Sequence, residues 1–157
     1  MTRVYFDHNA TTPLCDAARA AMVTAMDLVG NPSSVHSEGR AAKMMVERAR
    51  VQVSELVGCL PAQVVFTGSA TEAAALAVAQ KDRHGGQFVS LRTEHDCFLA
   101  WDEAANEGPA LRAISAANSE TGVVKPAVVS TASVSGAVVC DITQIAGKMP
   151  LVYDESG

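Results

Sequence analysis

The sequence predicts an α/β fold, a mostly parallel sheet with helices on both faces. Three observations lead to this prediction. After about residue 60, short apolar runs alternate with helical segments. The first of these runs, 64–67, is short and continuously apolar, as is typical of a strand covered on both faces. Finally, 157 residues with 48% hydrophobic content suffice for one core. We therefore treat 1–157 as a single domain, with a helical segment over 1–60 and the sheet over 61–157.

Two helices are expected in the helical segment. Thr12 is a suitable N-cap and Pro13 suits the first helical position, so the first helix should start there. Gly30 should end it. The second helix should begin at about Gly39 and stop at Gly58, because glycine favours the conformation that follows a helix end.

The rest of the chain predicts four strands and two intervening helices. The strands are expected over 64–67, 87–91, 111–116 and 137–140. The helices are expected over 71–81 and 97–106. The segment 130–136 is small and polar, which indicates a short connection before the last strand.

Composition excludes several classes of function. The net charge of −5 argues against nucleic-acid and anionic-membrane partners. No apolar run reaches the roughly 20 residues needed to span a bilayer. The four cysteines, Cys15, Cys59, Cys97 and Cys140, form no C-x-x-C pair. This spacing favours reduced thiols in a cytoplasmic protein over disulfides or a metal site.

Polar residues follow each predicted strand, at the sheet edge where ligands of open α/β sheets bind. Gly68 to Thr71 opens a helix, and free N–H groups there suit a phosphate. His95 follows the second strand and Asn118 the third. Asp141 and Gln144 follow the fourth.

This set of groups suits a phosphorylated heteroaromatic ring. A carboxylate can pair with a protonated ring nitrogen, an imidazole can stack on the ring, and amides can bond a ring hydroxyl. Each group also has an ordinary explanation. The 68–71 turn alone is usually only a turn, His95 alone is usually a satisfied histidine, and Asp141 alone could cap a helix. Their shared edge favours the ring.

Longer strings of residues indicate a family. The matching segments are Tyr5–Pro13, Gly30–His36, Val65–Thr67, Thr71–Ala73, Glu94–His95, Asn118–Gly122, Asp141 with Gln144, and Gly147–Pro150. With these strings the chain resembles the cysteine desulfurases of the NifS/IscS type, in the class V aminotransferase family. The resemblance covers the N-terminal part of the family's usual length. It implies the large cofactor domain of fold-type I enzymes that use pyridoxal 5'-phosphate.

The resemblance also implies roles for single residues around pyridoxal 5'-phosphate. Thr71 would bind the phosphate, His95 would stack on the ring, and Asp141 would pair with the ring nitrogen, which makes the ring an electron sink. Gln144 would bond the ring hydroxyl, and Asn118 would face the ring. Three residues would line the substrate side: Asn9, Ala10 and Thr11.

The resemblance further implies a dimeric enzyme that passes sulfur from cysteine to iron–sulfur scaffold or tRNA-thiolation proteins. Its Schiff-base lysine belongs to a Ser-x-His-Lys segment after Asp141, and its persulfide cysteine lies further on. These 157 residues contain neither, and Lys148 lies in a structural turn. We therefore assign no catalytic residue here, and expect the chain alone to be inactive and to bind the cofactor weakly or not at all.

Two hypotheses follow for function in iron–sulfur cluster assembly. In the first, the chain belongs to a desulfurase and acts only when another polypeptide supplies the lysine and the cysteine. The expected assembly is a homodimer or a heterodimer with a desulfurase-family chain. In the second, it is an inactive paralogue, a pseudoenzyme that binds a desulfurase or a scaffold protein.

Two local features also have alternative interpretations. Ser69 and Ala70 stand where the family has glycines, and this could strain the cradle. Cys97 could be an activated thiol, although a buried helix cysteine is the simpler interpretation.

Overall fold

The computed structural model describes residues 3–104, 107–125 and 136–151. It divides into two compact units. The first comprises Met1–Glu55 and Leu60–Val64, and the second Leu56–Cys59 and Val65–Gly157. The first unit is helical, and the second contains the sheet. No helix of the described residues is both long and apolar enough to cross a membrane.

Helix α1 of the first unit spans Asp16–Met26 and is rich in alanine, the best helix former. The predicted start at Thr12 and Pro13 is wrong, because Cys15 is the N-cap. The Thr12 hydroxyl instead donates to the His8 carbonyl at 3.4 Å.

Helix α2 spans Ser37–Val57, and the 3-10 helix η1, Pro61–Gln63, follows it. Gly39 lies where the loop before α2 contacts its first turn. A Cβ at this position would lie 2.6 Å from the Ser34 carbonyl oxygen and 2.7 Å from that of Asn31. The contact between loop and helix therefore requires glycine.

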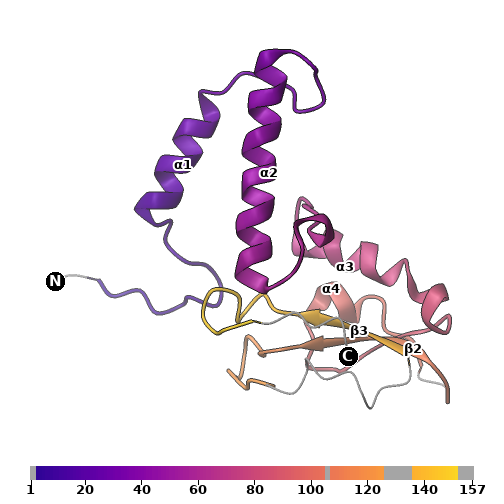
Figure 1. The fold of residues 1–157 in the computed structure, drawn as a ribbon. Coiled ribbons are helices and arrows are strands. Elements are labelled where there is room, and N and C mark those ends of the chain that lie inside the picture. The colour runs from indigo at the N-terminus through magenta and orange to yellow at the C-terminus, as the bar shows by residue number, and fades with distance from the viewer. Residues whose placement is uncertain (1–2, 105–106, 126–135, 152–157) are drawn as a thin grey trace. The chain divides into compact units, whose positions relative to one another are not determined.

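The second unit contains a parallel sheet in the order β1-β2-β3 (Figure 1). The strands are β1 Phe88–Ser90, β2 Ala110–Ser115 and β3 Gly136–Asp141. This confirms the predicted fold class and three of the four predicted strands. At Gly136, φ is 114° and a Cβ would lie 2.1 Å from the Ala110 carbonyl oxygen, so the β2–β3 pairing needs glycine there.

Two helices cover one face of this sheet, α3 Ala70–Val78 and α4 Asp96–Leu99 (Figure 1). The short helix η2, Lys81–His84, follows α3. The buried core joins these helices to the strands through Ala74, Val78, Phe88, Cys97, Phe98, Leu111 and Ala113. Within this core, the rings of Phe88 and Phe98 stack with 6.2 Å between centroids.

Two predicted elements differ in the structure. The 64–67 run is not a strand, since it pairs with none of the three described strands, and Val65 is 74% exposed. The helix predicted over 97–106 ends at Leu99. It ends there because Asp102 and Glu103 bond the outer edge of β1, through the N–H groups of Ser90 and Phe88. The predicted 130–136 connection lies outside the described residues except for Gly136.

Candidate functional site

A cavity of about 330 Å³ lies at the carboxyl ends of the strands in the second unit. Its walls come from the start of α3, the loop after β1, α4, and the segments after β2 and β3. The lining residues are Ala70, Thr93, Glu94, His95, Asp96, Cys97, Ser115, Ala117, Asn118, Ser119, Glu120, Asp141, Thr143 and Gln144. The structure therefore brings together four of the five predicted cofactor-site residues, namely His95, Asn118, Asp141 and Gln144.

The fifth predicted residue, Thr71, lies in the first turn of α3. It is exposed and does not line the cavity, whereas its neighbour Ala70 does. The N–H groups of Ala70 and Thr71 have no acceptor within the described part of the chain. Two free amides at the positive end of a helix dipole suit a phosphate.

The 68–71 turn is not strained by the loss of glycines. Ser69 is extended, with φ of −164°, and no described residue other than glycine has a positive φ. Its hydroxyl accepts the Glu72 N–H at 3.1 Å, and the Glu72 carboxylate accepts the Gly68 N–H at 2.6 Å. Ser69 thus caps the first turn of α3, and the Glu72 carboxylate holds the residue before the N-cap. The serine strengthens the helix start that a phosphate would use.

His95 is held as the N-cap of α4. Its Nδ1 accepts the N–H of Cys97 at 3.2 Å. In the neutral ring the proton therefore lies on Nε2. This bond fixes one edge of the imidazole, while the ring remains exposed on the cavity wall.

Asp141 lies at the end of β3, opposite Ser115 of β2. Alternation along the strands places both on the face that α3 and α4 cover, with Leu111 and Ala113. Asp141 Oδ1 accepts the Thr143 N–H at 2.9 Å. Its Oδ2 has no hydrogen-bond partner among residues 3–104, 107–125 and 136–151, so it is available to an N–H group of a ligand.

Asn118 shapes the turn after β2. Its Oδ1 accepts the N–H groups of Glu120 and Thr121 at 3.0 and 2.9 Å. Its Nδ2 donates to the Thr93 carbonyl at 2.8 Å. These bonds join two walls of the cavity, and the contact of Asn118 with a ring stays a prediction. Gln144 accepts a hydrogen bond from Lys148 Nζ at 3.4 Å.

The cavity is acidic. Its lining contains four carboxylates, from Glu94, Asp96, Glu120 and Asp141, and neither lysine nor arginine. A protonated ring nitrogen is favourable beside such carboxylates, whereas a phosphate is favourable only at the α3 amides. The donor set therefore fits pyridoxal 5'-phosphate with its nitrogen at Asp141 and its phosphate at α3.

Cys97 is buried in the cavity wall, as its simpler interpretation predicts. Burial raises the pKa of its thiol, and the nearby Asp141 carboxylate raises it further. A thiol that holds its proton is a poor nucleophile, so the activated-thiol interpretation is not supported.

The residues predicted on the substrate side belong to the first unit, and that role stays a prediction. Asn9, Ala10 and Thr11 are exposed, and the turn they form is closed by a bond from the Thr11 N–H to the Asp7 carbonyl at 3.3 Å. The first unit also holds a larger, more open hollow of about 490 Å³ beside Arg40 and Lys43. It lacks the convergent groups of the acidic cavity.

Sequence reasoning missed several lining residues. Glu94 and Ser115 are buried below the cavity, and Thr143 lies beyond Asp141. The sequence could have indicated Ser115, because alternate residues of a strand lie on one face and Ser115 follows the core residues Leu111 and Ala113 in steps of two. Among the described residues, no three His, Cys, Asp or Glu side chains are grouped as metal ligands.

Comparisons with known proteins agree with this architecture. A cysteine desulfurase of Frankia sp. (strain EuIK1) is 32% identical over 98% of this chain and 47% of its own length. An IscS-like cysteine desulfurase of Mycobacterium tuberculosis is 31% identical over 98% of the chain and 49% of its length. The chain thus spans about half the length of these relatives.

Solved structures match as well. A NifS-like protein superposes with a TM-score of 0.81 and 26% identity, over 98% of this chain and 52% of that one. A NifS-like protein from Rickettsia africae superposes with a TM-score of 0.65 and 27% identity, over 77% of this chain and 41% of that one. The profile of the family described as aminotransferase class-V matches residues 4–116. The chain belongs to the class-V aminotransferase family and is homologous to its cysteine desulfurases.

Proposed function

We propose that this chain is the cofactor-binding half of a cysteine desulfurase that mobilises sulfur for iron–sulfur cluster assembly. The observation that supports it best is the acidic cavity, where His95, Asp141 and Gln144 meet beside the start of α3. The lysine that holds the cofactor and the cysteine that carries the sulfur would come from outside these 157 residues. A dimer with a desulfurase-family chain that retains both residues would supply them, whereas a second copy of these 157 residues would not.

Each residue has a defined task in this proposal. Asp141 Oδ2 would accept a hydrogen bond from the protonated ring nitrogen, and His95 would offer the face of its fixed imidazole. Gln144 and Asn118 orient the ring hydroxyl, and Thr71 with the α3 amides binds the phosphate. When bound, pyridoxal 5'-phosphate supplies an electron sink for cleavage at the substrate's carbon atoms.

The carboxylates that line the cavity also explain how this chain would favour the protonated ring nitrogen of the cofactor. A carboxylate beside a ring nitrogen favours its protonated form. Ser115 faces Asp141 across the β2–β3 register, and Thr143 N–H bonds its Oδ1. The bond from the Thr143 N–H fixes Oδ1 and leaves Oδ2 for the ring nitrogen. Without the lysine, binding by this chain is non-covalent and weak.

A cofactor titration tests the proposal. The purified chain should bind pyridoxal 5'-phosphate with a dissociation constant in roughly the micromolar to millimolar range, seen as a change in visible absorbance or circular dichroism. Asp141→Asn should weaken binding by about tenfold, because the amide cannot balance the ring charge. The matched variant Asp16→Asn, in α1, should bind like the wild type.

An activity assay completes the test. Sulfide release from cysteine plus cofactor should equal the free-cofactor background for the chain alone. It should exceed that background when a desulfurase-family chain that retains its lysine and cysteine is added. If the chain binds no cofactor yet still forms a complex with such a protein, the inactive-paralogue interpretation is correct instead.

A further inference from the structure

Glu94 is a buried carboxylate that has no individual role in the proposed cofactor site. Its side chain is fully excluded from solvent, and it directly precedes His95 in the loop after β1. Burying a charge is costly unless other groups compensate for the lost water. The contacts of Glu94 therefore indicate what the fold gains from it.

The first contact ties the loop after β1 to the end of β2. Glu94 Oε2 accepts the backbone N–H of Ser115 at 2.6 Å and also the Ser115 hydroxyl. Ser115 lies opposite Asp141 in the β2–β3 register. One carboxylate oxygen thus links the residue before His95 to the strand position beside Asp141.

The second contact ties the same loop to the turn that carries Asn118. Lys125 Nζ lies 3.5 Å from Glu94 Oε1, which has no hydrogen-bond partner among the described residues. The N–H of Lys125 donates to the Ala116 carbonyl at 2.8 Å, which closes the turn. The bond from Asn118 Nδ2 to the Thr93 carbonyl is a separate tie between the same segments.

We propose that Glu94 is a positioning residue that sets the spacing of His95, Asn118 and Asp141 around the cavity. The inference rests on the proposed function, because it concerns the same cofactor site. The Glu94 side chain joins the loop before His95 to the end of β2 and to the turn of Asn118, and β2 in turn pairs with β3 at Asp141. In this role it acts through Ser115 and Lys125.

The variant Glu94→Gln tests this inference with little change in shape. The amide oxygen can still accept from Ser115, but the NH₂ group then meets the Lys125 ammonium, so two donors face each other. The turn that carries Asn118 should therefore shift away from residue 94. We expect the dissociation constant for pyridoxal 5'-phosphate to rise about tenfold, as for residues that orient ligand-binding groups from behind.

A second readout needs no cofactor. The NMR signals of the His95 ring and the Asn118 side-chain amide should shift in ligand-free Glu94→Gln. Both signals, and the affinity, should recover in the double variant Glu94→Gln with Lys125→Met, which removes the facing ammonium. A residue that supports only global stability would not give this recovery of local signals.

The matched control is Glu107→Gln, which makes the same charge change at an exposed position of the second unit. It should leave the affinity and both signals unchanged. The inference is overturned if Glu94→Gln leaves the His95 and Asn118 signals in place, or if the double variant recovers neither signal. Should Glu94→Gln fail to fold, Lys125→Met alone must shift the Asn118 signal.

The two proposals fail separately. If the wild-type chain binds no pyridoxal 5'-phosphate, the proposed function fails, and the ligand-free signals still decide the role of Glu94. If binding is intact and unaffected in Glu94→Gln, the positioning role fails and the proposed function stands.

Discussion

Two buried serines of the sheet are in opposite situations. Ser90, in β1, has a buried hydroxyl with no hydrogen-bond partner among the described residues. Ser115, in β2, donates its hydroxyl to the buried Glu94 carboxylate. A buried polar group is favourable only when it is paired, so the same substitution should have opposite effects at these two positions.

We predict that Ser90→Ala raises the free energy of unfolding by about 0.5–1 kcal/mol, because it removes an unpaired hydroxyl. Its backbone bond to Asp102 at 2.6 Å does not depend on the side chain. Ser115→Ala should lower the free energy of unfolding by about 1–2 kcal/mol, since a bond to a charged group is lost. Urea titration followed by circular dichroism measures both values. Equal signs for the two variants would contradict the hydrogen-bond assignment.

Cys97 gives a prediction about reactivity. Burial and the Asp141 carboxylate raise the pKa of its thiol, so little thiolate forms near neutral pH. Iodoacetamide should therefore label Cys97 at least about tenfold more slowly than the exposed Cys15. Peptide mass spectrometry of a time course separates the two sites, and labelling in urea should remove the difference. Fast labelling of Cys97 in the folded chain would restore the activated-thiol interpretation.

At the scale of elements, side chains bond the outer edge of β1. Glu103 Oε2 accepts the Phe88 N–H at 3.2 Å, and the Glu103 N–H donates to the Phe88 carbonyl at 3.1 Å. Lys81, in η2, binds the other oxygen of this carboxylate. Such bonds replace a neighbouring strand and protect the edge from pairing with another chain.

This edge predicts a dependence of stability on pH. The hydrogen bond from Lys81, and then the one from Phe88, lower the pKa of Glu103 below its ordinary value of 4.5. Because the folded pKa is the lower one, the stabilisation is complete above about pH 4.5 and is lost as the pH falls through the folded pKa.

Thermal unfolding between neutral and acidic pH measures this effect. The wild type should lose more stability on acidification than Glu103→Gln does, because the variant lacks the titrating group. The exposed Glu107→Gln serves as the control and should follow the wild type. Parallel curves for the wild type and Glu103→Gln would show that the carboxylate does not stabilise the edge.

The elements around β1 also illustrate which parts of the fold could be predicted from the sequence. The ends of the predicted strands 87–91, 111–116 and 137–140 lie within one residue of the ends of β1, β2 and β3, because short runs rich in apolar residues are a local signal. The helix predicted to reach residue 106 stops at Leu99, because bonds to β1 are a tertiary effect. The 64–67 run has the same local signal as a strand, but a strand also needs a partner.

For the cavity too, local sequence patterns predicted some residues, and tertiary contacts determined others. His95, Asn118, Asp141 and Gln144 were predicted to meet, because each follows a parallel strand and such strands end at one edge. Glu94 could not be assigned a role, since its partners Ser115 and Lys125 are 21 and 31 residues away in the chain and no local pattern joins them.

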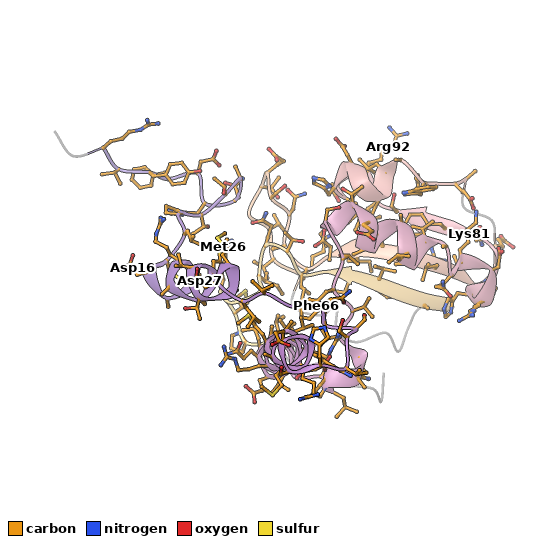
Figure 2. All side chains as sticks on the ribbon, turned by 90° about the horizontal axis from the view of Figure 1, so that it is seen from above. Asp16, Met26, Asp27, Phe66, Lys81 and Arg92 are labelled. Atoms are coloured by element: carbon orange, nitrogen blue, oxygen red, sulfur yellow. The ribbon has the colours of Figure 1, made fainter. Side chains whose placement is uncertain are left out.

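At the scale of the whole molecule, many large apolar side chains are exposed. They include Phe6, Met26, Val29 and Val35, which are 76–87% exposed, in the first unit. Figure 2 shows Met26 at the end of α1, next to Asp27. Exposed apolar area of this extent favours association, because covering it releases water from apolar surface.

We therefore predict that the chain is not a monodisperse monomer in solution. Light scattering at about tens of micromolar, where weak association becomes measurable, should give a mass above that of one chain. Met26→Lys should shift the distribution toward monomer, because a charge in a covered apolar site is unfavourable. Thr24→Lys, which places the same charge two residues earlier on an exposed polar position of α1, is the matched control and should change the mass less. A clean monomer in the wild type, or equal effects of the two lysine variants, would show that this apolar surface of α1 does not mediate association.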